Sequence, residues 1–169
     1  MDDAPGEIID IDSGKVVGEH RGIHQWTIGQ RIPLTKKNGH QPEKTFVASK
    51  NVEAKILYSC QGSDHPSLFC RQFFARDPHW ITGFQPEDLR HGSKTLKCEF
   101  RVQNTQPLMP CHVTFSMTST SNFEFMDQSR ITVSSLEPLR AVTPGQYVAL
   151  YSGSECLGSA VIERTLSGN

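Results

Sequence analysis

Apolar and polar residues alternate along much of this chain with a period close to two. In residues 96–103 the even positions are apolar and the odd positions are polar, and residues 111–117 repeat the pattern. A period of two places successive side chains on opposite faces of a β-strand, whereas a helix has a period of 3.6. No segment of the sequence offers three turns of an amphipathic helix. The pattern therefore predicts an all-β protein.

Turn-forming residues divide the chain into short predicted strands. Ser13 and Gly14 separate residues 7–12 from residues 15–18, which predicts a hairpin with a tight, glycine-containing turn. Residues 45–48 and 54–58 predict a second hairpin. Polar residues rich in Gly, Pro, Asn or Ser predict loops at 33–43 and 118–122. Further strands are expected at residues 25–28, 68–74, 80–81, 123–126, 130–133, 146–151 and 156–162.

The strongest turn signal in the chain is Gln-Gly-Ser-Asp-His-Pro at residues 61–66. Such a cluster is typical of a connection between two folded modules. We therefore expect residues 1–62 to form a small β module and residues 63–169 to form a β-barrel of about six strands.

Length and composition narrow the class of protein. The chain has 169 residues, of which 36% are hydrophobic and 21% are charged, as expected for a soluble globular protein. The longest apolar stretches, such as residues 147–151, are far shorter than the roughly 20 residues that a membrane helix needs. Residues 1–6 lack the basic and apolar segments of a signal peptide. We therefore expect no membrane association and no secretion signal.

The net charge of −1 conceals a separation of charges along the chain. Residues 1–14 carry five acidic residues and no basic residue, whereas residues 15–101 carry 14 Lys and Arg against 8 Asp and Glu. Residues 102–169 carry 3 basic and 5 acidic residues. A basic middle part permits a surface that faces a polyanion, although ordinary solvated strand faces would give the same pattern.

Neither a metal site nor an active site is visible in the sequence. The five cysteines are an odd number, are widely spaced and include no C-x-x-C pair, so we expect reduced thiols and no structural zinc. Cys98 and Cys111 lie in alternating apolar patterns, which predicts buried, inert thiols. His20 and His24 could share a metal only on a helix, and their surroundings are turn-like. The sequence also lacks the common phosphate-binding loops and hydrolase motifs.

Four motifs, in order along the chain, resemble those of the tRNA-specific 2-thiouridylases, and together they span essentially the whole chain. The first is GEHRG at residues 18–22 with TIGQR at residues 27–31, which resembles the G-x-H-x-G and T-[IL]-G-Q-R signature of that family. The other motifs are DHPSL at residues 64–68, FRVQ at 100–103 with PC at 110–111, and AVTPGQYVALY at 141–151 with CLGS at 156–159. Among the family, the mitochondrial members look most similar to this sequence.

The resemblance implies a tRNA-modifying enzyme of which this sequence carries only a part. Family members activate the wobble uridine with ATP in an N-terminal domain, and a cysteine persulfide then delivers sulfur. The nucleotide loop S-G-G-x-D-S and the catalytic cysteines of that domain are not in this sequence. We therefore expect the central module and the C-terminal barrel, which bind tRNA, with no catalytic, cofactor-binding or metal-binding residue.

The resemblance also implies partners and a location for the full-length enzyme. ATP is its cofactor, and tRNA and a protein that donates sulfur are its partners. It is mitochondrial by resemblance to the mitochondrial members, or cytoplasmic if the protein is bacterial.

Three tRNA-contacting positions carry over from the family, namely Arg101, Val102 and Gln146. Arg101 lies on the polar face of its predicted strand, where a guanidinium can reach a phosphate. Val102 replaces the aromatic residue of the family, so a stacking contact is not expected there. Gln146 has a second reading, as a residue that caps the bend at Pro144 and Gly145. Residues 29–31 are interpreted as a structural loop between the modules.

Two other functions fit the same sequence. One is a stand-alone β-barrel that binds RNA without any role in thiolation. The other is a protein-interaction module with no nucleic-acid partner, because a fold alone does not determine a function.

Overall fold

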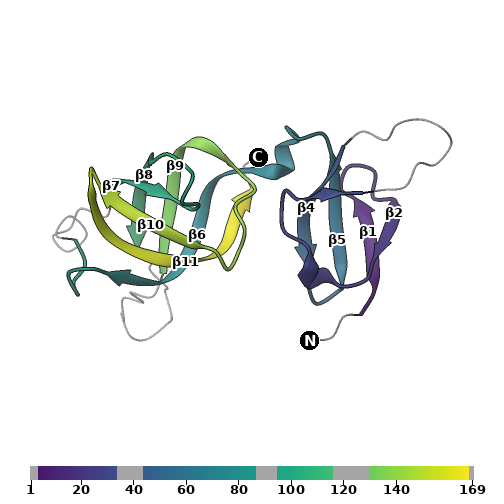
Figure 1. The fold of residues 1–169 in the computed structure, drawn as a ribbon, viewed down its shortest axis with the longest axis horizontal. Helices are drawn as coiled ribbons and strands as arrows, with labels where there is room; N and C mark the ends of the chain where they lie inside the picture. Colours follow the sequence, from purple (N-terminus) through teal and green to yellow (C-terminus); the bar gives the residue numbers. More distant parts are fainter. Residues whose placement is uncertain (1–3, 34–43, 87–94, 116–129, 168–169) are drawn as a thin grey trace, which may run out of the picture. The chain divides into compact units, whose positions relative to one another are not determined.

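The computed structural model describes residues 4–33, 44–86, 95–115 and 130–167. They contain eleven strands and two short 3-10 helices, so the all-β prediction is confirmed. The chain divides into two compact units, Met1–Phe69 and Cys70–Asn169 (Figure 1). This division lies seven residues beyond the expected boundary after residue 62, which stays a prediction. The predicted turn at 118–122, the predicted strand at 123–126 and nearly all of the predicted loop at 33–43 lie outside the described residues.

The first unit is a five-stranded sheet with the order β2-β1-β5-β4-β3. β1 pairs with β5 in parallel, and the other neighbours are antiparallel. Both predicted hairpins are confirmed, as the pairs β1–β2 and β4–β5. The strands are β1 (Gly6–Asp10), β2 (Val16–His20), β3 (Arg31–Ile32), β4 (Thr45–Asn51) and β5 (Ile56–Gln61), and the 3-10 helices are η1 (Ile23–Gln25) and η2 (Pro66–Leu68).

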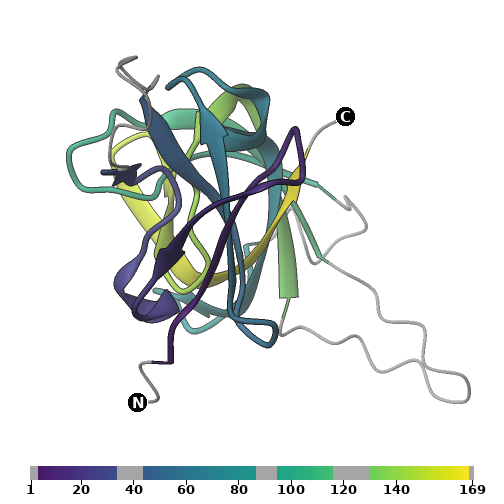
Figure 2. The same ribbon diagram turned by 90° about the vertical axis from the view of Figure 1, so that its right-hand side faces the viewer.

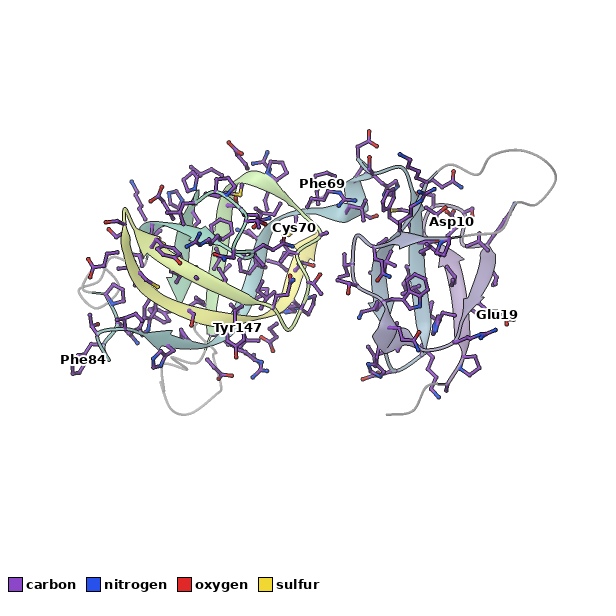
Figure 3. All side chains as sticks on the ribbon, in the orientation of Figure 1. Asp10, Glu19, Phe69, Cys70, Phe84 and Tyr147 are labelled. Atoms are coloured by element: carbon purple, nitrogen blue, oxygen red, sulfur yellow. The ribbon has the colours of Figure 1, made fainter. Side chains whose placement is uncertain are left out.

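Asp10, labelled in Figure 3, is the last residue of β1, and its carboxylate holds the turn between β1 and β2. Its Oδ1 accepts hydrogen bonds from the backbone N–H of Ser13 at 2.9 Å and from the Ser13 hydroxyl at 2.6 Å. The backbone of Asp10 bonds to Gly14 and Lys15, both at 2.9 Å. Gly14 has φ +66°, a conformation that glycine adopts without steric cost. These hydrogen bonds explain why the first strand ends at Asp10 and the chain turns back through Ser13 and Gly14.

The prediction of a strand at residues 25–28 is wrong. Residues 23–25 form η1, and the chain then turns before it pairs with β4. Pairing begins only at Gly29, whose N–H donates to the Val47 carbonyl at 2.8 Å, while the Val47 N–H donates to the Gln30 carbonyl at 2.9 Å. Trp26, which follows η1, is half-buried and packs against the core of this unit. Packing of the apolar side chains decides the conformation here, not local strand propensity.

The second unit is a closed barrel of six strands, in the order β10-β11-β6-β9-β8-β7. Figure 1 labels these strands, and Figure 2 gives the same ribbon turned by 90°. The predicted number of strands is therefore confirmed. β10 pairs with β7, which closes the barrel. The strands are β6 (Phe69–Trp80), β7 (Leu96–Arg101), β8 (Met109–Phe115), β9 (Arg130–Arg140), β10 (Tyr147–Ser152) and β11 (Glu155–Ser167).

The barrel interior is filled by the apolar positions of the alternating strands. On β7, Leu96 and Phe100 are buried, while Lys97 is exposed, as the period of two predicts. The Phe100 ring, only 1% exposed, packs on the Phe73 ring of β6 with 5.9 Å between the centroids. Phe100 thus joins strands that are not neighbours in the sheet, and it is central to the core of the barrel.

We expect Phe100→Ala to lower the free energy of unfolding by about 3–5 kcal/mol, because it removes a buried ring and leaves a cavity. Chemical denaturation followed by circular dichroism measures the change. Lys97→Ala, on the exposed face of the same strand, is the matched control and should change stability by less than about 0.5 kcal/mol. Equal effects of the two substitutions would contradict the described register of β7.

A second prediction concerns acid stability. The hydrogen bonds from Ser13 hold the pKa of Asp10 below its ordinary value. A lowered pKa stabilises the folded state above the pKa of the unfolded chain, and this contribution is lost as the pH falls through the folded value. As the pH falls below about 5, the free energy of unfolding should therefore decrease less in Asp10→Asn than in the original chain. Urea unfolding at several pH values measures this decrease. Asp64→Asn, on an exposed turn, should leave this decrease as in the original chain.

Candidate nucleic-acid interface

Arg101 lies at the end of β7, opposite Ala149 of β10. Its Nη2 donates to the Tyr151 hydroxyl at 3.0 Å, and its guanidinium carbon lies 5.0 Å from the centroid of the Tyr151 ring. A weaker contact, at 3.5 Å, reaches the carbonyl of Asn104. The partners of this guanidinium are thus a neutral hydroxyl, a ring and a carbonyl, and no carboxylate pairs with it within the described residues. Its charge remains available to an anion.

Val102 follows directly after β7 and is half-buried. Its side chain packs against the hydrophobic core of the barrel, in line with its place on the apolar face of the alternating pattern. A packed aliphatic side chain offers no stacking surface to a base. Any contact of Val102 with RNA therefore has to use its backbone or the exposed edge of the side chain.

Gln146 lies where the chain enters β10, and its backbone holds the bend in place. Its N–H donates to the Thr143 carbonyl at 3.3 Å, and its carbonyl accepts from the Ile162 N–H at 2.8 Å. The side-chain Oε1 is buried and has no hydrogen-bond partner among the described residues. The amide oxygen therefore does not cap the bend. A buried polar atom without a partner costs free energy.

The pairing of β7 with β10 brings these three residues to one end of the barrel. Arg101 ends β7, and Gln146 precedes β10, whose residue Ala149 faces Arg101. The alternation nevertheless separates their side chains. Arg101 lies on the outer face, whereas Gln146 is on the same side of the strand as Val148, which is fully buried. Arg101, Val102 and Gln146 thus lie at one end of the barrel, which we call the rim. The Arg101 guanidinium lies outside the barrel, and the Gln146 amide lies toward its interior.

Sequence reasoning missed two aromatic residues of this rim, Tyr147 and Tyr151. Tyr147 projects from the barrel with 66% of its surface exposed (Figure 3). It lies two residues from Ala149, so it is a diagonal neighbour of Arg101, at a spacing of roughly 7–8 Å between Cα atoms. The alternation of exposed Tyr147 with buried Val148 and Leu150 was the available signal. The outer face therefore presents a strip with Arg101 between two tyrosines.

Most other arginines on the described part of the barrel already have partners. Arg76 pairs with Asp77 at 2.6 Å, and Arg130 pairs with Glu163 at 2.9 Å. Arg164 lies over the Phe74 ring, 4.4 Å from its centroid. Arg71 donates to the Leu136 carbonyl. Arg101 therefore shares with Arg71 and Arg164 a set of neutral contacts in place of a carboxylate partner among the described residues.

The Thr-Ile-Gly-Gln-Arg motif is built as a closed turn. Gln30 donates from its N–H to the Thr27 carbonyl and accepts from the Thr27 N–H through its side-chain oxygen, both at 3.0 Å. Gly29 between them has φ +80°. The interpretation of residues 29–31 as structural agrees with this geometry. Their place needs correction, because they lie within the first unit and not between the two units.

The described residues contain no cluster of three or more metal-binding side chains. His20 is buried in β2, with Nε2 3.0 Å from the Lys55 carbonyl oxygen, whereas His24 is exposed on η1. No helix in the described ranges is long and apolar enough to cross a membrane. The rim of the barrel is thus the described place where the residues singled out from the sequence gather.

Comparison with protein families matches both units. Residues 70–162 match a family model described as the aminomethyltransferase beta-barrel domain, and residues 1–61 match one described as the tRNA methyl transferase PRC-barrel domain. The first match covers more than half of the chain and the whole described barrel except its last strand end.

Similar proteins are named as enzymes that modify tRNA. The chain is 40% identical over 164 residues to mitochondrial tRNA-specific 2-thiouridylase 1 of Drosophila melanogaster. The aligned region covers 97% of the chain and 38% of that relative. It is 35% identical over 158 residues to the tRNA-specific 2-thiouridylase MnmA of Chlamydia pneumoniae, covering 94% and 38%. It is 37% identical over 166 residues to MnmA of an Enterobacter species, covering 96% and 40%. The chain thus spans about two fifths of the length of these curated relatives.

Proposed function

Since this chain belongs to the tRNA-specific 2-thiouridylase family, we propose that it is the tRNA-binding part of an enzyme that 2-thiolates the wobble uridine of tRNA. The observation that carries the proposal is the state of Arg101. Its guanidinium is held on the outer face of the barrel by Tyr151, and no carboxylate among the described residues neutralises it. A fixed, uncompensated guanidinium is suited to a phosphate, which it can bind through two parallel hydrogen bonds.

The neighbours of Arg101 supply the other contacts that RNA requires. The exposed ring of Tyr147 offers a face on which an unpaired base can stack. The Gln146 side-chain oxygen is buried and faces the interior, so any contact of Gln146 with RNA would use the other atoms of this residue. Val102 contributes through its backbone. In this arrangement Arg101 fixes the position of the RNA backbone, and the aromatic and amide groups add contacts specific to single-stranded nucleotides.

The chemistry of thiolation belongs to parts of the enzyme outside this sequence. We propose that the full-length enzyme uses ATP to activate the uridine and receives persulfide sulfur from a donor protein. A mitochondrial location is supported by the Drosophila relative, and a cytoplasmic one would apply to a bacterial protein. A role as a stand-alone RNA-binding or protein-interaction barrel is an alternative outcome of the experiments below.

The purified chain alone should neither hydrolyse ATP nor form 2-thiouridine, because its sequence contains neither the S-G-G-x-D-S loop nor the catalytic cysteines of the family. Nucleoside analysis of tRNA by mass spectrometry, with ATP and a sulfide source present, tests this. A full-length relative is the positive control. Thiolation by the chain alone at the rate of the full-length relative would overturn the division of labour proposed here.

Arg101→Ala should weaken tRNA binding by about 1 kcal/mol, roughly fivefold, which is typical of one charge-assisted contact at a hydrated surface. Fluorescence anisotropy with labelled tRNA measures it. The logarithm of the binding constant should fall with the logarithm of the salt concentration, with a slope of about 0.7–0.9 per phosphate contacted, and Arg101→Ala should reduce that slope.

Arg130→Ala is the matched control, because Arg130 is paired with Glu163 and lies on β9, away from β7 and β10. It should change the affinity much less than Arg101→Ala. Equal binding of tRNA and of a random acidic polymer, unaffected by Arg101→Ala, would instead favour a barrel without a specific RNA role.

A further inference from the structure

Two of the five cysteines face each other across neighbouring strands of the barrel. Cys98 of β7 and Cys111 of β8 are directly opposite in the antiparallel register, and their Sγ atoms lie 3.6 Å apart. Opposite residues of an antiparallel pair have Cα atoms about 4.5 or 5.5 Å apart, and both values fall in the range of about 4.4–6.8 Å found in disulfides. The backbone is therefore already placed for an S–S bond. Small side-chain rotations would bring the two sulfur atoms together.

The two thiols differ in their solvent exposure and in the direction in which their pKa is shifted. Cys98 is half-buried, whereas Cys111 is buried with 2% of its surface exposed. The hydrogen bond from Cys111 lowers the pKa of Cys98, while the same contact and burial raise the pKa of Cys111. Cys98 is thus the thiol that ionises first and the one that solvent reaches. Since the thiolate is the nucleophile, Cys98 is the attacking residue and Cys111 is the resolving one.

The other three cysteines have different surroundings. Cys60 and Cys70 are buried, and desolvation raises the pKa of Cys70 to about 11. Cys156 is half-buried, and its Sγ contacts the Gly158 carbonyl at 3.9 Å. Cys98 and Cys111 combine a direct contact between their Sγ atoms with a partly exposed thiol. The sequence predicted inert thiols throughout, because it does not reveal which strand positions face each other.

We propose that Cys98 and Cys111 form an oxidisable dithiol, which a peroxide converts into a disulfide between β7 and β8. The Cys98 thiolate attacks hydrogen peroxide, so that an S–O bond forms, the O–O bond breaks and hydroxide leaves to be protonated to water. Cys111 then attacks the sulfur of the resulting sulfenic acid. The S–S bond forms, the S–O bond breaks, and hydroxide leaves with the Cys111 proton as a second water. Two thiols are oxidised and one peroxide is reduced.

The site adjoins the rim of the barrel without depending on it. Cys98 precedes Arg101 by three residues on the same strand, and the even and odd positions of β7 place their side chains on opposite faces. The disulfide would tie β7 to β8 from the interior and leave the guanidinium outside. Oxidation of the two thiols therefore does not require RNA binding.

Peptide mapping of the full chain tests the proposal. The reduced protein is freed of reductant and exposed to graded hydrogen peroxide, its remaining thiols are blocked with N-ethylmaleimide, and it is digested without reduction for mass spectrometry. The peptide pair joined through Cys98 and Cys111 should become the main intramolecular disulfide, before Cys60 or Cys70 is modified, and dithiothreitol should reverse it. Failure to find this pair while Cys98 and Cys111 stay alkylatable, or turn into sulfonic acids, would overturn the proposal.

Single substitutions separate the roles of the two thiols. Cys111→Ser should trap Cys98 as a sulfenic acid that reacts with dimedone, and Cys98→Ser should leave Cys111 unmodified at the same dose of peroxide. Cys156→Ser, a half-buried cysteine of the same barrel, is the matched control and should give the disulfide in the original yield. Dimedone labelling of Cys98 no greater in Cys111→Ser than in the original chain would contradict the assignment. The linkage map of the original chain needs no variant, so it decides the proposal even where a variant fails to fold.

Discussion

The pairing of β7 with β10 is the interaction on which the second unit depends, because it closes the barrel. Its register, Ala149 opposite Arg101 and Leu150 opposite Phe100, fixes which side chains face inward and which face outward. A shift of one residue would expose Phe100 and bury Arg101 at once, at a cost that the core could not sustain. The same register brings Tyr151 beside Arg101 and places Gln146 at the adjoining end of the barrel. The packing of the core and the composition of the outer face around Arg101 are thus two consequences of one set of backbone hydrogen bonds.

Much of this fold could be predicted from the sequence, because a period of two is a local signal. The alternation of residues 96–103 gave the buried and exposed faces of β7 correctly, and the Ser13-Gly14 turn and the six-stranded barrel were equally accessible. The strand expected at residues 25–28 failed for a physical reason. Four residues carry too little pattern to outweigh the tertiary packing of Ile23 and Trp26, which turns the chain before it reaches β4.

The candidate site is formed by contacts between residues that are distant in the chain. The sequence predicted these contacts less well than it predicted the strands. Resemblance to a family singled out Arg101, but nothing local indicates that Tyr151, fifty residues away, holds its guanidinium. The facing thiols of Cys98 and Cys111 were hidden in the same way, since strand register is decided by the closure of the sheet and not by either strand alone. Val102 shows the converse, because its alternation already placed it toward the core.

The surroundings of Arg101 make the rim a candidate site for an anion. Arg101 is braced by a neutral hydroxyl and a ring, so it keeps its charge while losing much of its conformational freedom before any ligand arrives. The Tyr151 hydroxyl is engaged by this guanidinium, while the ring of Tyr147 stays exposed on the same face. Under the proposed function, Arg101 would hold a phosphate and the Tyr147 ring would offer a surface to a base. The barrel would then position the RNA, and the reacting groups would come from other parts of the enzyme.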